Sequence, residues 1–277
     1  TLTDSSAASD VYKRQSLVFI TAEYPFGNQE TFIENEISLL ADAFDHVIVL
    51  PKSSLGRPRT MPPNCSIGRP YGPRSASIGN NHLLSEWLQT RGHFGKGKIA
   101  YRSWQGVGKR LTQIMDSTED IKGELLYYSY WLDEGAIAIA HLAKRVGSSA
   151  ISRAHGWDVY PKRHPFKYLP FRRFLASSGI KVCPISMHGE EALRAQGFTN
   201  LHLYYLGTPA SKKMETTDKP NTKTLVSISS IIELKRVQRI AEIFLKLYQQ
   251  DNTWRWHHFG DGPLAVSYTH LTLPTSR

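Results

Sequence analysis

Short apolar runs alternate along the chain with longer segments whose apolar residues recur at helical spacing. The short runs are rich in valine, isoleucine, leucine and aromatic residues. Continuous apolar runs of this length are typical of strands that are buried on both faces of a sheet. The pattern predicts strands at residues 16–21, 46–50, 124–128, 150–153, 181–185, 200–205, 224–229 and 254–259.

The longer segments predict amphipathic helices. A helix is expected from about residue 31, because four apolar residues share one face: Ile33, Ile37, Leu40 and Phe44. Further helices are predicted at 81–115, with a weak point at 92–97, at 134–145, at 186–196, and after residue 229 around Val237, Ile240, Ala241, Phe244, Leu245 and Tyr248. Residues 53–80 are rich in proline, glycine, serine and arginine, and they predict a long loop.

The alternation of strands and helices predicts the fold class and the domains. It favours an α/β fold with a mostly parallel, doubly wound sheet, because parallel strands need long crossover connections. Residues 208–222 are polar and lysine-rich and read as a linker. They separate an amino-terminal Rossmann-like domain, 16–207, from the start of a second Rossmann-like domain, 223–264. The carboxyl ends of the strands then share one edge of each sheet, where ligands bind.

The two ends of the sequence look foreign to the rest. Asp10–Gln15 and Val266–Leu271 can be encoded by DNA stretches that are reverse complements of each other. Both stretches resemble the mosaic-end adapter of transposon-based sequencing libraries. We therefore expect residues 1–15 and 265–277 to be non-native, adapter-like tails, and the second domain to be incomplete.

Composition narrows the class of protein. Of the 277 residues, 40% are hydrophobic and 21% are charged, which is typical of a soluble globular protein. Two cysteines are too few for a disulfide framework, and neither a spanning apolar run nor a signal-peptide pattern is visible. We expect a cytoplasmic protein and exclude secreted, membrane-spanning and collagen-like classes.

Charge adds a preference for anionic partners. Lysine and arginine number 34 against 24 acidic residues, a formal net charge of +10. Such a balance favours nucleic acid, phosphorylated small molecules or the anionic surface of a membrane, without choosing among them. The basic residues are scattered and no nucleic-acid-binding motif is present, so no nucleic-acid partner is expected.

Familiar catalytic motifs are absent from the sequence. Cys65 and Cys183 are far apart and no HExxH pattern occurs, so no zinc or other metal site is expected. There is also no Gly-x-Ser-x-Gly elbow and no GxxxxGK[ST] phosphate loop. The candidate chemistry lies instead in segments that follow predicted strands.

Two of these segments belong to the first domain. Around Gly27, a glycine loop before a helix offers backbone amides to an anion or a sugar hydroxyl, although a plain turn fits equally well. His155 can exchange hydrogen bonds near neutral pH, and Gly156 lets a ligand approach the backbone; a structural histidine is the alternative. Asp158 is expected either to orient His155 or to cap the next helix.

A third segment, 227–236, belongs to the second domain. Lys235 and Arg236 follow a predicted strand and could clamp a diphosphate, arginine in a bidentate way. A solvated basic loop is the alternative. Gly260 and Gly262 follow the last predicted strand and are, by themselves, ordinary turn chemistry.

Five segments, taken in order, carry a family resemblance. They are ETFIENEI at 30–37, RAHGWDVY at 153–160, YLGT at 205–208, VSISSIIELKRV at 226–237 and HHFGDGPL at 257–264. The set resembles bacterial glycosyltransferases of family 4, most closely those of colanic-acid, exopolysaccharide and lipopolysaccharide assembly. The resemblance implies the GT-B fold, in which the first domain holds the acceptor and the second the nucleotide sugar.

The resemblance also implies roles for single residues. His155 matches the family's active-site histidine, which contacts the donor sugar, and Gly27 lies in a loop that faces the cleft. Lys235 matches the lysine that neutralises the donor diphosphate. Many members have an arginine five residues before this lysine, where this chain has Ser230, and Arg236 is the candidate substitute. The nucleotide side of the site is implied to include Gly260 and Gly262.

The resulting interpretation is a fragment of a retaining glycosyltransferase that transfers a sugar from a nucleotide-sugar donor to a glycan or lipid-linked acceptor in bacterial surface polysaccharide biosynthesis. No cofactor is expected, because cationic side chains and helix amino termini would stabilise the leaving diphosphate. The family's paired glutamates, spaced Glu-x7-Glu, would lie beyond residue 264, so this chain alone is expected to be inactive. The basic surface predicts peripheral contact with the anionic inner membrane.

Two alternatives stay open. One is another GT-B enzyme, such as a nucleotide-sugar epimerase. The other is a non-enzymatic protein that binds anions or nucleic acid, which the net charge of +10 favours.

Overall fold

The computed structural model describes residues 15–208 and 223–265 of the chain, which divides into a first unit, 1–210, and a second unit, 211–277. The predicted tails and the predicted linker lie almost wholly outside the described residues. Gln15, assigned above to the first tail, is the first residue of a strand.

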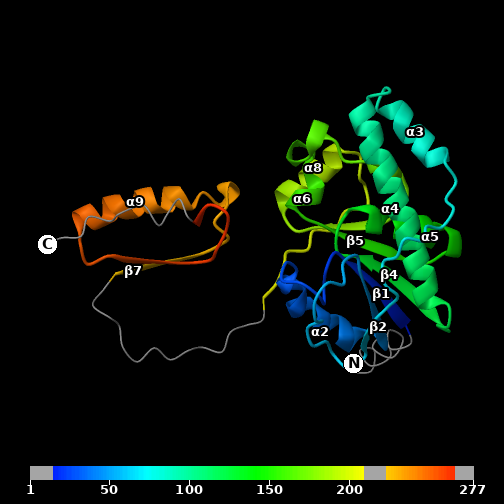
Figure 1. Ribbon diagram of the computed structural model, residues 1–277, viewed down its shortest axis with the longest axis horizontal. Coiled ribbons are helices and arrows are strands. Elements are labelled where there is room, and N and C mark those ends of the chain that lie inside the picture. Colours follow the sequence, from blue (N-terminus) through cyan, green and yellow to red (C-terminus); the bar gives the residue numbers. More distant parts are fainter. Residues whose placement is uncertain (1–14, 209–222, 266–277) are drawn as a thin grey trace, which may run out of the picture. The chain divides into compact units, whose positions relative to one another are not determined.

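The first unit contains a six-stranded parallel sheet (Figure 1). Its strands stand in the order β3-β2-β1-β4-β5-β6, so the direction of winding reverses between β1 and β4. The strands are β1 (Gln15–Thr21), β2 (His46–Pro51), β3 (Cys65–Ile67), β4 (Glu124–Ser129), β5 (Ala150–Ala154) and β6 (Lys181–Pro184). The predicted fold class, a mostly parallel α/β sheet, is confirmed.

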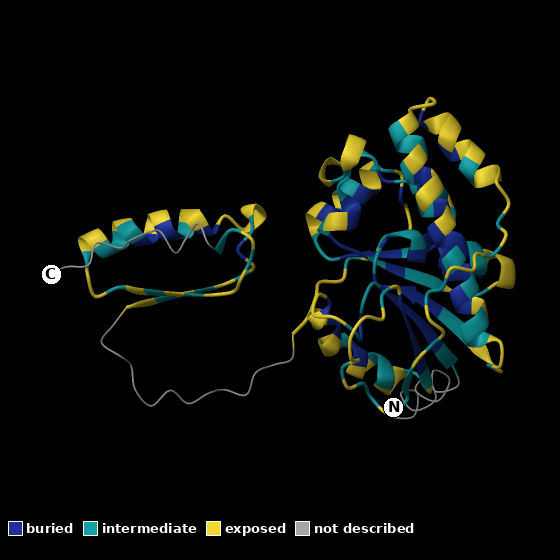
Figure 2. Ribbon diagram, in the orientation of Figure 1, coloured by how far each residue is buried: buried dark blue, intermediate teal, exposed yellow. Residues whose placement is uncertain are grey.

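Helices cover both faces of this sheet. They are α2 (Glu34–Ala43), α3 (Asn81–Gln89), α4 (Phe94–Thr118), α5 (Glu134–Val146), α6 (Gly156–Val159), α7 (Arg172–Ser177) and α8 (Met187–Ala195), with short 3-10 turns at Thr31–Ile33, Pro161–Arg163 and Pro165–Lys167. Along β1, Val18 and Ile20 pack with α4 and α5, whereas Leu17 and Phe19 pack with α2 on the other face. Figure 2 shows the resulting buried centre. Burial on both faces explains why the strands read as continuous apolar runs.

The prediction of a strand at 200–205 is wrong. Only Leu201 forms an isolated bridge, with Val182 of β6. The amides of His202 and Tyr204 do bond to carbonyls of β6, at 2.9 and 3.1 Å. Pro184 has no amide hydrogen to donate in return, so the ladder cannot continue.

Two other boundaries differ from the sequence-based expectation. The loop predicted at 53–80 contains the three-residue strand β3, which pairs with Val47–Val49 of β2. The helix predicted at 81–115 is two helices, and the break between them falls at Arg91 and Gly92, at the start of the weak point predicted at 92–97; the φ angles of these two residues are 52° and 70°. The short helix α7 was not predicted, because six residues are too few to show a helical period.

The second unit is smaller. Its strands β7 (Thr224–Ile228) and β8 (Arg255–Phe259) pair in parallel, and α9 (Val237–Gln250) packs on one face through Phe244, whose ring centroid lies 5.8 Å from that of Trp256. A 3-10 turn, Glu233–Lys235, precedes α9. On the other face the side chains of Val226, Ile228 and Phe259 are exposed.

A buried arginine ties the carboxyl ends of β1 and β2 together. Arg110 of α4 is 1% exposed, and its guanidinium donates to the carbonyls of Thr21, at 2.7 Å, and Leu50, at 2.9 Å. A third hydrogen bond, of 2.8 Å, joins it to the side chain of Gln113. Burial lowers the pKa of Arg110, and none of the described residues forms an ion pair with it. The cation is therefore held by carbonyl dipoles.

Replacing Arg110 with methionine removes the charge and keeps the length of the side chain. Because two buried carbonyls each lose a charged donor, we expect the free energy of unfolding of the first unit to fall by about 3 kcal/mol. Denaturant unfolding followed by tryptophan fluorescence measures the change. Arg102→Met, at an exposed arginine of the same helix, is the control and should cost less than about 0.5 kcal/mol. Equal midpoints for the two variants would contradict the assignment.

Candidate functional site

The candidate residues of the first unit gather at one edge of its sheet. Gly27 follows β1, Trp131 follows β4 and His155 follows β5, and these three strands are neighbours. Because the strands are parallel, their carboxyl ends meet at the same edge, beside the point where the winding reverses. The structure therefore brings His155, Asp158 and Gly27 to a common edge, as their positions after strands predict.

A buried glutamate shapes the loop after β1. Glu30 is 2% exposed, and its carboxylate accepts hydrogen bonds from the amides of Ala22, Glu23 and Tyr24, at 3.2, 2.6 and 2.7 Å. It also accepts one from the indole of Trp131. These three amides are therefore occupied by the protein's own carboxylate. That backbone amides around Gly27 receive an anion or a sugar hydroxyl stays a prediction.

His155 lies in an aromatic stack. Its ring centroid is 4.5 Å from that of Trp131 and 5.0 Å from that of Tyr130. The side chain is 8% exposed, and neither ring nitrogen has a hydrogen-bond partner among the described residues. Burial lowers the pKa of His155 to about 4, and the positive charge of Arg153 acts in the same direction. The imidazole is therefore neutral at physiological pH, and both of its nitrogens are buried.

Asp158 joins the loops after β4 and β5. Its carboxylate accepts hydrogen bonds from the amide of His155, at 2.6 Å, and from the amide of Leu132, at 2.7 Å. Burial raises the pKa of Asp158 to about 7, against the effect of these two bonds and of the nearby Arg172. Asp158 positions His155 through the backbone and does not touch the imidazole nitrogens.

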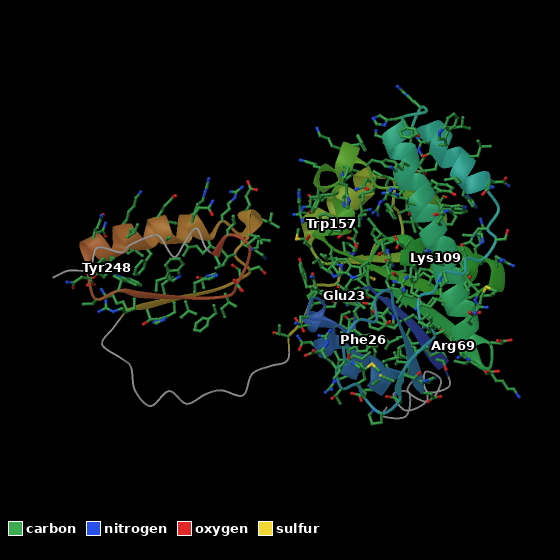
Figure 3. All side chains as sticks on the ribbon, viewed as in Figure 1. Glu23, Phe26, Arg69, Lys109, Trp157 and Tyr248 are labelled. Atoms are coloured by element: carbon green, nitrogen blue, oxygen red, sulfur yellow. The ribbon has the colours of Figure 1, made fainter. Side chains whose placement is uncertain are left out.

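A cavity of about 730 Å³ opens at this edge of the first unit. Segments after β1, β2, β4 and β5 line it together with α4. Figure 3 shows two of its lining side chains, Lys109 on α4 and Trp157 on α6. The aromatic residues of the lining are Tyr71, Trp131, Trp157 and Tyr168, and the ionisable ones are Lys52, Arg102, Lys109, Asp133, Glu134, Asp158, His164 and Arg172.

One wall of the cavity combines cations with an aromatic ring. The Nζ atoms of Lys52 and Lys109 lie 5.9 and 6.0 Å from the centroid of Tyr71. Lys52 also pairs with Glu134 at the start of α5. Burial lowers the pKa of Lys52, but the neighbouring Glu134 and Asp133 raise it by more. Lys109 has no ion-pair partner among the described residues, so its charge is available to a ligand.

Carboxylates stand next to these cations in the cavity. Asp133 caps α5 by accepting a hydrogen bond of 2.8 Å from the amide of Gly135. Burial and the charge of Glu134 raise the pKa of Asp133. A carboxylate with a raised pKa accepts hydrogen bonds, or a proton, from a bound hydroxyl group.

Arg172 supports this side of the cavity. Its guanidinium donates to the carbonyls of Leu132 and Asp158, at 3.2 and 2.5 Å, while its Nε and Nη1 atoms have no partner among the described residues. Burial lowers the pKa of Arg172 to about 10. Arg172 therefore fixes the backbone directly after Trp131 and directly after Trp157.

The candidate residues of the second unit lie in two adjacent loops. The loop after β7 bonds to the loop after β8 through the amides of Ser229 and Ile231. A Cβ atom on Gly260, whose φ is 148°, would lie 1.9 Å from the carbonyl oxygen of Ser229. A Cβ atom on Gly262 would lie 2.4 Å from that of Ile231. Both glycines are therefore required by backbone packing.

Two cations stand beside these loops at the start of α9. Lys235 ends the 3-10 turn, and Arg236 precedes the first residue of α9 with a φ of 50°. Both side chains and Ser230 are exposed. Neither cation forms an ion pair within the described parts of the chain. The arrangement presents two charges next to a helix amino terminus, where an anion is stabilised.

Sequence reasoning missed four contributors to the first unit's site. Asp133 and Glu134 follow a predicted strand, and the same rule that selected His155 would have found them. Glu30 resembles an ordinary acidic residue at a helix start. Arg172 gives no local signal, because its partners lie 14 and 40 positions away.

Within 15–208 and 223–265, no group of three or more histidine, cysteine or acidic side chains is arranged to hold a metal ion. In the same ranges, no helix combines the length and the apolar character that crossing a bilayer requires.

No protein-family model and no curated protein matches the chain. A solved structure of a TarM mutant from S. aureus, with fondaparinux, alpha-GlcNAc-glycerol and UDP, is 11% identical with a TM-score of 0.41, over 60% of this chain and 33% of that one. The glycotransferase of kitacinnamycin is 12% identical with a TM-score of 0.40, over 89% and 65%. UDP-N-acetylglucosamine 2-epimerase from Rickettsia bellii is 11% identical with a TM-score of 0.41, over 94% and 65%.

The chain thus spans less than two thirds of each of these structures. At such identities and TM-scores the similarity concerns the course of the backbone and carries no argument about function.

Replacing His155 with phenylalanine keeps the aromatic stack and removes the titratable group. The folded pKa of about 4 lies below the ordinary value of 6.5, so the unfolded chain binds more protons between these values. The wild-type protein therefore loses stability as the pH falls through this range. We expect the variant to lose about 2 kcal/mol less than the wild type between pH 7 and pH 5.

Denaturant unfolding at the two pH values measures this difference. His188→Phe, at an exposed histidine of α8, is the matched control and should keep the wild-type pH dependence. Parallel pH profiles for the wild type and His155→Phe would show that the imidazole is not held neutral.

Proposed function

We propose that the protein is part of a GT-B glycosyltransferase whose first unit binds a glycan or lipid-linked acceptor and whose second unit binds a nucleotide sugar. The observation that carries this proposal is the cavity of about 730 Å³ at the carboxyl edge of the first unit's sheet. Its volume and its place at the reversal of winding are typical of small-molecule sites in α/β proteins.

The lining of the cavity suits a sugar. Trp131, Trp157 and Tyr168 offer flat apolar faces against which the C–H face of a pyranose ring can pack. Asp133 and Glu134 offer carboxylate oxygens that accept hydrogen bonds from hydroxyl groups. A purely apolar ligand would leave the remaining lone pairs of these carboxylates without partners, whereas a polyhydroxylated ring satisfies both kinds of surface.

The loops of the second unit suit the diphosphate of a nucleotide sugar. Lys235 and Arg236 are exposed and unpaired within the described residues, and they flank the amino terminus of the 14-residue helix α9. Charge-assisted hydrogen bonds to phosphate oxygens are the strongest contacts that such groups make. In the proposed reaction they stabilise the leaving diphosphate, and no cofactor is invoked.

The family resemblance gives His155 the role of contacting the donor sugar. In the first unit its ring stacks on Trp131, which lines the cavity, so His155 supports the cavity wall. On the resemblance of the five ordered segments, we place the protein with family 4, with retention of configuration and a role in surface polysaccharide assembly. No protein nucleophile is assigned.

Binding of saccharides tests the acceptor side. Saturation-transfer NMR with a panel of neutral and acidic trisaccharides should detect binding to the wild-type chain. Trp157→Ala should weaken it by between about threefold and tenfold, because one ring face is lost. Trp87→Ala, at a partly exposed tryptophan outside the cavity lining, is the control. If no saccharide in the panel receives saturation from the protein, the acceptor role is contradicted and the epimerase alternative is favoured.

Binding of nucleotides tests the donor side. Titration calorimetry with UDP, GDP and their sugars measures affinity, and Lys235→Ala should lower it by roughly tenfold through the loss of one charge-assisted bond. Lys246→Ala, at an exposed lysine further along α9, removes the same charge away from the loops. Equal affinities for the two variants would refute the role of Lys235.

A further inference from the structure

A patch of large apolar side chains covers the outer side of the α3–α4 hairpin. Leu84, Trp87 and Leu88 of α3 are 58%, 49% and 61% exposed, and Phe94 and Tyr101 of α4 are 83% and 52% exposed. We call these five residues the hairpin patch. Figure 2 shows α3 as a largely exposed helix. A surface helix usually turns polar residues outward, so an outward apolar face needs another explanation.

The inner side of α3 already holds the helix in place. Glu86 is buried and accepts a hydrogen bond from the hydroxyl of Tyr168. Leu83 packs against the main hydrophobic core, and the hydroxyl of Thr90 bonds to the carbonyl of Trp87 at 2.7 Å. Contacts outside the hairpin patch therefore already attach α3 to the fold.

A shallow groove gives the hairpin patch a fixed shape. A cavity of about 320 Å³ lies between the two helices and is lined by Leu84, Trp87, Gly97 and Tyr101 among others. A Cβ atom on Gly97 would lie 3.4 Å from Cδ1 of Trp87, so the indole rests on the glycine backbone. The aromatic side chains are thus held ready on the surface.

From residue 81 to residue 102, every exposed charge on the hairpin is positive. Residues 81–102 contain one acidic residue, the buried Glu86. The cations are Arg91, Lys96, Lys98 and Arg102, and none of them forms an ion pair with any residue that the structure describes. A partner that complements this surface must be apolar and anionic at once.

We propose that the α3–α4 hairpin docks the protein on the anionic surface of a lipid bilayer. The hairpin patch enters the boundary between headgroups and acyl chains, and the four cations contact the anionic headgroups. Leucine and aromatic residues beside lysine and arginine are the composition of helices that lie in this boundary. This inference stands independently of the glycosyltransferase proposal.

The hairpin also adjoins the cavity of the first unit. Tyr101 belongs to the hairpin patch, and its neighbours Arg102 and Ser103 line the cavity. A protein docked in this way holds the cavity next to the membrane surface, where a ligand with a lipid tail is presented.

Vesicle co-sedimentation of the full chain tests the proposal. We expect binding to vesicles of phosphatidylcholine and phosphatidylglycerol in equal parts, weakening as salt rises, and little binding to phosphatidylcholine alone. Lys96→Gln with Lys98→Gln should lower partitioning by roughly fivefold per cation. Leu84→Ser with Leu88→Ser should lower it by roughly tenfold or more, because two buried leucines are lost.

Matched variants separate the hairpin from the rest of the surface. Leu39→Ser with Leu55→Ser removes two other exposed leucines, and Lys144→Gln with Arg145→Gln removes two cations at the end of α5. Both should bind like the wild type. Since all substituted side chains are exposed or partly exposed, circular dichroism and the thermal midpoint should stay unchanged in every variant.

Several outcomes would overturn the proposal. One is no binding of the wild type to the mixed vesicles at low salt, and another is equal loss in the hairpin and control variants. Loss in the charge variant alone would indicate adhesion without insertion. Light scattering without vesicles checks whether Leu84→Ser with Leu88→Ser changes the oligomeric state. Such a change would show that the hairpin patch contacts a second copy of the chain. Trp157→Ala should bind vesicles normally, so failure of the acceptor proposal is distinguishable.

Discussion

The carboxylate of Glu30 holds the loop after β1 in the shape on which the rest of the candidate site depends. It takes three backbone amides of that loop and the indole of Trp131, which follows β4. Trp131 in turn stacks on His155, which follows β5. One buried charge thus links the ends of three adjacent strands. The carboxylate is satisfied by four donors, which is the condition under which a buried charge is tolerated.

At the same edge, the buried carbonyl groups near the ends of β1 and β2 need hydrogen-bond donors. Arg110 supplies them, with bonds of 2.7 and 2.9 Å to Thr21 and Leu50. The anionic Glu30 therefore accepts hydrogen bonds from the amides of the loop, and the cationic Arg110 donates hydrogen bonds to the carbonyls of the strands. With the backbone satisfied by buried side chains, the groups that face the cavity, including Asp133 and Lys109, remain available for a ligand.

The local sequence pattern predicted most helices and strands, because parallel strands that are buried on both faces consist of continuous apolar runs. It could not show that Pro184 interrupts pairing with residues 200–205, nor that three residues, Cys65–Ile67, suffice for an edge strand, since both depend on partners distant in sequence. The site divides in the same way. Position after a strand identified His155, whereas the roles of Glu30 and Arg110 follow from contacts up to 101 and 89 residues away.

Two surfaces of the first unit expose tryptophan, and charge tells them apart. Around Trp157 the cavity lining mixes cations with the carboxylates of Asp133 and Glu134, which would repel a sheet of anionic headgroups but suit the hydroxyl groups of a sugar. Around Trp87 the exposed charges are all positive, which would leave a neutral sugar without hydrogen-bond acceptors. Aromatic rings alone do not choose a ligand. The sign of the charges around each ring separates the two proposed partners, a sugar at Trp157 and an anionic membrane surface at Trp87.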